Sequence, residues 1–252
     1  MEAKHNPLFE QARQRGLTQP TPELGIGTLG EKRLHAILKL FYQPDASLHE
    51  RKIGRMTADA ILNDGSIVEI QTGSFSSLRK KLPVFLACGP VHLVAPVIAE
   101  KWVCWVSPET GEILSRRRSP KRYAPIDLAR ELNTIREFLS HPDLTVHFPF
   151  LTAKEYRLLD GWGNGGKRGS SRYERIPLAL LEEWVMETPA AYVCLLPSNL
   201  PERFTTKELQ HSARISSRCA YAAAALFRSL DIIEEAGTQG RARLYQLKKQ
   251  NN

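Results

Sequence analysis

The sequence has few cysteines, and they are far apart. Its 252 residues contain Cys88, Cys104, Cys194 and Cys219, which form no C-x-x-C pair. Because structural zinc sites are usually built from closely spaced ligand pairs, neither a zinc site of that kind nor a disulfide framework is expected. Scattered thiols of this sort fit a reducing compartment, where they serve as small core residues.

The sequence also lacks a long apolar run. No stretch approaches the roughly 20 apolar residues that a helix needs to cross a bilayer. The first segment, Met1–Gly16, is polar and charged and has no apolar centre of a signal peptide. We therefore expect a protein of the cytoplasm without a membrane partner.

What the chain does have is a core and an excess of positive charge. Apolar residues make up 42% of it, which suffices for one large domain or for a medium domain with a small one. Lys and Arg number 35 against 27 Asp and Glu, giving a formal net charge of +8. This balance favours a polyanionic partner such as nucleic acid, although many basic proteins bind nothing acidic.

Three parts are predicted along the chain. Residues 1–27 are expected to form a flexible arm, because prolines and glycines accompany little hydrophobic periodicity there. Residues 28–175 are predicted to form an α/β domain. Residues 176–252 are predicted to form a smaller module, because the character of the chain changes near Ile176.

The α/β domain is predicted to begin with the order α-β-β-β-α-β. Its first helix is expected over Thr28–Tyr42, with Thr28 and Glu31 as a capping box. The elements that follow are predicted over His49–Gly54, Thr57–Leu62, Ser66–Thr72, Phe75–Leu86 and Val91–Val97. Further along, the pattern predicts a strand over Lys101–Ser107, a helix over Pro125–Leu139, an outer strand over Leu144–Leu151 and a glycine-rich loop over Asp160–Ser171.

The residues that carry chemistry lie on the predicted second and third strands. Strand alternation places Glu69 and Gln71 on one face, and an Asp-Gly turn folds the preceding strand back so that Asp59 lies beside Glu69. Two neighbouring carboxylates repel each other unless a cation lies between them. Mg²⁺, or Mn²⁺ in its place, suits such a pair, since Mg²⁺ takes few carboxylates and keeps waters that a phosphate can replace. The alternative is a pair of ordinary solvated strand residues.

Asp59, Glu69 and Gln71, on the order α-β-β-β-α-β, resemble the PD-(D/E)XK nuclease superfamily, which has a restriction-endonuclease-like mixed sheet flanked by helices. The resemblance covers Thr28 to Val97. It implies a metal-dependent endonuclease that hydrolyses DNA phosphodiester bonds, with the metal on Asp59 and Glu69. The whole chain also resembles an uncharacterised bacterial protein family.

In the superfamily a Lys at the position of Gln71 handles the attacking water, although some restriction enzymes carry Gln or Glu there. Gln71 can orient that water but cannot accept its proton. Lys80 and Lys81, on the next predicted helix, are candidates for the missing positive charge, or else plain surface charges. Glu31 matches a Glu that the superfamily often has on its first helix, or is a capping residue only. A nuclease fold that lost its chemistry and kept DNA binding or a regulatory role is the alternative function, which the Gln at position 71 favours.

Basic residues gather in two runs that we expect to contact a DNA backbone. The first run consists of Arg116, Arg117, Arg118, Lys121 and Arg122, and the second, in and after the glycine-rich loop, of Lys167, Arg168 and Arg172. Tyr123, Trp162 and Tyr173 lie among them and are candidates for stacking on bases or for packing. A solvated charged face is the alternative for both runs.

The last segment has the order helix, turn, helix, hairpin, which is typical of a winged-helix module. Thr205 and Glu208 predict a capping box on its first helix, and Ser216 begins its second.

In this module Arg218 would contact DNA from the second helix, and Arg241 and Arg243 from the wing. The second helix is rich in Ala and offers few groups that reach a base edge, so the module either grips the backbone or pairs with another protein chain. A transcription factor whose first domain dimerises is a third reading, and a homodimer stays open.

Overall fold

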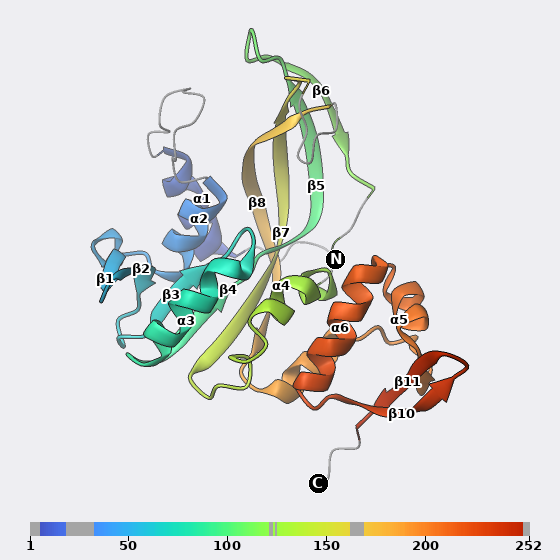
Figure 1. The fold of residues 1–252 in the computed structure, drawn as a ribbon. Helices are drawn as coiled ribbons and strands as arrows, with labels where there is room; N and C mark the ends of the chain where they lie inside the picture. The colour runs from blue at the N-terminus through green and yellow to red at the C-terminus, as the bar shows by residue number, and fades with distance from the viewer. Residues whose placement is uncertain (1–5, 19–32, 121–122, 124, 162–168, 249–252) are drawn as a thin grey trace.

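The computed structural model describes residues 6–18, 33–120, 123, 125–161 and 169–248, and it shows a mixed α/β fold (Figure 1). A large sheet carries helices on both faces, and a small second sheet lies near the C-terminus. Within these ranges no helix is long and apolar enough to cross a membrane. All four cysteines are free; Cys104 and Cys219 are buried, and Cys88 and Cys194 are exposed.

The large sheet has eight strands, in the order β1-β2-β3-β4-β7-β5-β6 with β8 paired to β7. The strands are β1 (His49–Ile53), β2 (Met56–Ile61), β3 (Ile67–Ile70), β4 (Val91–Val94), β5 (Val97–Val106), β6 (Ile113–Arg118), β7 (Leu144–Leu158) and β8 (Ser171–Met186). β3 and β4 are parallel, and β7 is parallel to both β4 and β5, while the other pairs are antiparallel.

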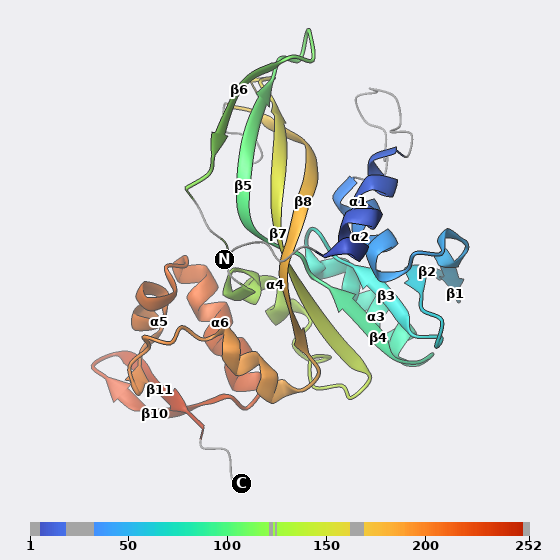
Figure 2. The same cartoon turned by 180° about the vertical axis from the view of Figure 1, so that it is seen from behind.

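β7 connects the body of the sheet to a long arm. Its residues 144–147 pair with β4 and its residues 150–158 pair with β5, while β8 lies along its other edge. The strands β6, β5, β7 and β8 therefore leave the body together, as both views show (Figure 1, Figure 2). The expectation of an outer strand over Leu144–Leu151 is wrong, because β7 has partners on both edges.

Helices cover the two faces of the sheet. They are α1 (Pro7–Thr18), α2 (Arg33–Tyr42), α3 (Leu78–Leu86), α4 (Ala129–Thr134), α5 (Thr206–Ala213) and α6 (Ser217–Ser229), with 3-10 turns η1 (Ala46–Leu48), η2 (Phe75–Ser77), η3 (Pro125–Leu128) and η4 (Pro189–Leu195). α1 and α2 pack in one core cluster with Val68 and Ile70, and α3 and α4 pack in another with Ile67 and Leu93. The elements α2, β1, β2, β3, α3 and β4 follow the predicted order α-β-β-β-α-β.

Residues 7–18 form a helix where a flexible arm was expected, so that expectation is wrong for them. The Asn6 side chain caps the helix by accepting a hydrogen bond from the Phe9 amide at 3.0 Å, and Pro7 takes its first position. Phe9 is buried on the side that meets α2. Gly16 lies so close to α2 that a Cβ there would come within 2.5 Å of Ile37 Cγ1.

The C-terminal module shares its core with the large domain. α5 begins with the predicted capping box of Thr205 and Glu208, and α6 begins at the predicted cap Ser216. The small sheet has the order β10-β11-β9, formed by β9 (Arg203–Phe204), β10 (Ile233–Gln239) and β11 (Ala242–Leu247). The expected boundary at Ile176 falls inside β8, which pairs with β7 up to Met186.

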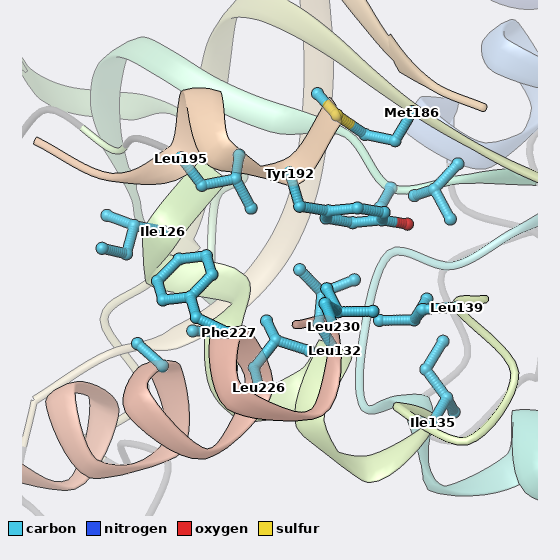
Figure 3. Packing of buried hydrophobic residues seen from close by; sticks show 14 of the residues in the cluster. Ile126, Leu132, Ile135, Leu139, Met186, Tyr192, Leu195, Leu226, Phe227 and Leu230 are labelled. Carbon is cyan, nitrogen blue, oxygen red and sulfur yellow. The ribbon is translucent and has the colours of Figure 1, made fainter. Parts of the chain in front are cut away.

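α6 packs against η3 and α4, and this contact accounts for its alanines. Ala220, Ala223 and Ala224 are buried, and the Cys219 thiol lies 3.3 Å from the Ile126 carbonyl oxygen. Figure 3 shows the larger side chains of α6, α4, η4 and β8 meeting in this cluster. The sequence pattern predicted one helix over Pro125–Leu139. The structure instead has η3, the short helix α4 and a turn in which Ile135 and Leu139 are buried.

Candidate metal centre

The two predicted carboxylates lie where β2 and β3 separate. These strands pair only at Ala60–Val68 and at Ile61–Ile67. Beyond that point the Ile70 amide is not paired with the β2 backbone and instead donates to the side-chain oxygen Asp59 Oδ2 at 2.6 Å. Asp59 therefore fills the opening between the strands from the β2 side. Its side chain is largely buried, with 8% of the residue exposed.

Glu69 enters the same region from β3 and is more deeply buried, with 3% of the residue exposed. Its Oε1 accepts a hydrogen bond from Lys81 Nζ at 2.7 Å, while its Oε2 is buried and has no partner in the part of the chain that is described. Burial and the charge of Asp59 raise the pKa of Glu69 to about 7, although Lys81 opposes this. The positive charge of Lys81 is therefore not enough to offset burial and the neighbouring carboxylate.

Asp59 has a partner that the sequence pattern did not reveal. His35, on α2, places its Nε2 3.0 Å from Asp59 Oδ2. Burial disfavours the charged form of Asp59, but the hydrogen bond and charge of His35, the Ile70 amide and the charge of Lys81 outweigh it, so the pKa of Asp59 is lowered. A single histidine at a helical position carries no motif, and only the packing of α2 on the sheet brings it to the site.

Lys81, and not Gln71, supplies the positive charge beside Glu69. Lys81 also donates to the Thr57 carbonyl oxygen at 3.0 Å, which holds its ammonium group over the carboxylate. The Gln71 side chain donates to the Ser74 carbonyl oxygen at 2.5 Å and makes no hydrogen bond to either carboxylate among the described residues. Lys80 is exposed, and Glu31 lies outside the described residues.

The carboxylate pair offers oxygen ligands of the kind that a hard divalent cation takes. Within the described ranges no group of three or more His, Cys, Asp or Glu side chains is arranged to hold a metal ion. A Mg²⁺ ion needs only one or two carboxylates when a phosphate and waters complete its shell. Among the described residues, Glu69 Oε2 is the carboxyl oxygen of this pair that is buried without a hydrogen-bond partner, and it is the atom that such a cation would bind.

The predicted basic residues of β6 lie along the free edge of the arm, where all six positions of the strand are exposed. Arg117 lies over the Trp105 ring at 5.0 Å, and Arg116 and Arg118 lie over Trp102 at 5.8 Å and 5.9 Å. The two tryptophans are residues that the sequence pattern missed. Four predicted basic residues and one aromatic lie outside the described residues: Lys121, Arg122, Lys167, Arg168 and Trp162.

The other predicted basic residues do not join this edge. Arg172 lies on β8, among Arg157, Arg175 and Glu155. Arg218 is exposed on α6, and Arg241 and Arg243 are exposed at the β10–β11 hairpin. Figure 1 shows the arm and the C-terminal module leaving the body in different directions, so the basic residues form separate surfaces.

Comparison with known proteins places the chain in a family. Residues 32–187 match the model of a family described as Domain of unknown function (DUF8091). The chain is also similar to a protein of Treponema pallidum (strain Nichols) described as uncharacterized, with 28% identity over 226 residues that cover 87% of this chain and 86% of that protein. No solved structure matches significantly. Because the family model spans more than half of the chain, from before α2 to the end of β8, the chain belongs to the DUF8091 family.

Proposed function

We propose that this chain is a metal-dependent nuclease that hydrolyses DNA phosphodiester bonds, with Mg²⁺ or Mn²⁺ held by Asp59 and Glu69. The observation that carries the proposal is the pair of buried carboxylates where β2 and β3 separate, with Lys81 Nζ 2.7 Å from Glu69. The element order α2-β1-β2-β3-α3-β4 supports a restriction-endonuclease-like core.

A bound divalent metal would polarise a phosphoryl oxygen and lower the pKa of a coordinated water. Glu69 would hold it through its unpartnered Oε2, and Asp59 through the oxygen that His35 and the Ile70 amide leave free. Lys81, fixed by the Thr57 carbonyl, keeps a positive charge beside the site where negative charge develops in the transition state. His35 is a positioning residue, because it orients the Asp59 carboxylate.

Lys81 offers what the motif lacks at Gln71. Gln71, two residues after Glu69, has only an amide, which provides dipoles and no net charge. An ammonium group brought in from α3 restores that charge without a change in the strand. The exposed arginines of β6 support nucleic acid as the substrate, since guanidinium groups on an extended edge can neutralise successive phosphates.

One observation favours a second function, a DNA-binding or regulatory protein without cleavage. Lys81 and His35 each already occupy an oxygen of one carboxylate, so the pair is partly neutralised by the protein itself. In that case the basic arm would still bind DNA, and the carboxylates would only stabilise the fold. The two functions differ in whether a divalent metal leads to strand breakage.

Nicking of supercoiled plasmid by the full chain separates them. We expect nicking that needs Mg²⁺ or Mn²⁺ and stops with EDTA. Lys81→Met should lower the rate by on the order of 10²–10³, as loss of one electrostatic contact to the transition state does. Lys80→Met is the matched control and should cut like the wild type, because Lys80 is exposed one position away. A folded wild type that binds plasmid and leaves it intact with both metals would establish the second function.

A further inference from the structure

A small pocket lies at the base of the arm, close to the end of β3. It encloses about 180 Å³. Thr72, the residue that follows Gln71, forms part of its wall, and Tyr123 and Asp127 close it from the segment before α4. Lys101 of β5 and Arg175 of β8 line it from the arm. The pocket therefore lies beyond the C-terminal end of β3, the strand that carries Glu69 of the candidate metal centre.

The wall of the pocket combines an apolar and a cationic side. Val97, Ile98 and Leu128 are among the apolar residues that line it. On the other side the Lys101 ammonium lies 5.9 Å from the centre of the Tyr123 ring. A wall of this kind suits a group that joins an anion to a less polar body, as the phosphate and sugar of a nucleotide do.

The charges behind the pocket are unbalanced. Lys101, Arg157 and Arg175 all bind the buried carboxylate of Glu155, at 3.1, 3.2 and 2.7 Å. Arg172 is close enough that burial and the charges of its basic neighbours lower its pKa. Among the described residues, four cations thus lie around one buried carboxylate, and Asp127 adds one further acid in the pocket wall.

One donor of this cluster has no acceptor. Arg175 uses its NH2 group to bind Glu155, while its Nε is buried without a hydrogen-bond partner in the described part of the chain. Buried donors are nearly always paired, so an isolated one needs an explanation. The same Arg175 side chain lines the pocket, so a guanidinium that can bind an anionic group forms part of the pocket wall.

We propose that this pocket binds a phosphate group of a nucleic-acid strand, held by Lys101 and Arg175, with the sugar against the apolar wall. The assignment of this phosphate to a nucleic acid rests on the proposed function. Binding of a phosphate group in the pocket does not itself require cleavage. A terminal 5′-phosphate and an internal phosphodiester share this chemistry. Either would bring a nucleic-acid strand to the C-terminal end of β3, the strand that carries Glu69.

The first measurement is calorimetry of the full chain with thymidine 5′-monophosphate and with thymidine, in EDTA so that no metal takes part. We expect the monophosphate to bind and the nucleoside, which lacks the anion, to bind at least about tenfold more weakly, as charge-assisted hydrogen bonds of 1.5–3 kcal/mol require. Equal affinity for the two compounds, or no binding of the monophosphate, would overturn the proposal.

Two variants and a matched control locate the binding. Lys101→Met should lower the affinity for thymidine 5′-monophosphate about tenfold or more. Arg157→Met is the control, because Arg157 also binds Glu155 but does not line the pocket. Leu128→Trp fills the pocket without a change of charge and should also abolish binding. The site is refuted if Lys101→Met and Arg157→Met weaken binding equally, or if Leu128→Trp, shown to be folded by circular dichroism, binds like the wild type.

Oligothymidylates with a 5′-phosphate or a 5′-hydroxyl then identify the source of the phosphate. Tighter binding of the phosphorylated strand, lost in Leu128→Trp, assigns the pocket to a strand end. Equal binding of both strands, reduced equally in Leu128→Trp, assigns it to an internal phosphate. Binding of both strands that Leu128→Trp leaves unchanged contradicts the proposal. Since no step requires cleavage, a chain that binds these probes and never nicks plasmid refutes the proposed nuclease activity alone.

Discussion

Glu155 should make the stability of this protein depend strongly on pH in the acidic range. Its carboxylate is almost completely buried, with 2% of the residue exposed, and three basic side chains bind it. Burial raises the pKa of Glu155, but the hydrogen bonds and charges of Arg175 and Lys101 outweigh burial and lower it from 4.5 to about 2. The ionised form is therefore favoured in the folded chain.

The direction of this pH dependence follows from the linkage between proton binding and folding. A carboxyl group whose pKa is lower in the folded than in the unfolded chain stabilises the fold above the unfolded pKa. This contribution is lost as the pH falls from about 4.5 to about 2. A pKa difference of 1 between the folded and unfolded chain corresponds to about 1.4 kcal/mol. The difference between 4.5 and about 2 therefore means that ionised Glu155 contributes about 3 kcal/mol to the free energy of unfolding near neutral pH.

Urea unfolding of wild type and Glu155→Gln over this pH range measures the effect. The wild type should be more stable by roughly 3 kcal/mol at pH 6, and the difference should shrink steadily toward pH 2. Glu69, whose pKa is raised from 4.5 to about 7, affects stability between these pH values, but it does so in both proteins and therefore cancels in their difference. A difference that stays constant from pH 6 to pH 2 would refute an ionised, ion-paired Glu155.

Two further predictions concern the N-terminal helix and the arm. Gly16→Val should lower the free energy of unfolding, measured by heat or urea, by about 1–3 kcal/mol, because the valine side chain would collide with Ile37. Unchanged stability would mean that α1 does not pack on α2. Replacing Arg116, Arg117 and Arg118 together by Ala should make the plot of log K for binding of duplex DNA against log salt concentration shallower, by at most about 3 in slope. An unchanged slope would mean that β6 is only a solvated face.

Local signals in the sequence predicted much of the fold. The capping box of Thr205 and Glu208 and the cap of Ser216 each join residues that are three apart, so the pattern is complete within a few positions. The order of core elements followed from hydrophobic spacing and from one Asp-Gly turn. α1 was missed, although Asn6 and Pro7 are typical of a helix start, because it buries few large apolar side chains.

The parts that depend on packing between distant segments could not be predicted. Lys81 reaches Glu69 only because α3 packs on β3, and His35 reaches Asp59 only because α2 packs on the opposite face. The pattern pointed to Gln71 because it lies in the motif, whereas the charge arrives from a different element. Strand order is equally non-local, and nothing near residues 144–151 indicates that β4, β5 and β8 all pair with β7.

Calorimetry with Mn²⁺ tests whether Asp59 and Glu69 form a metal site. Wild type should bind Mn²⁺, while Asp59→Asn and Glu69→Gln should each lose binding, since either change removes one of two anionic ligands. Asp143→Asn, which removes a surface carboxylate outside the centre, should bind like the wild type. Mn²⁺ binding that is absent from the wild type, or that is equal in all four proteins, would contradict a metal centre at this carboxylate pair.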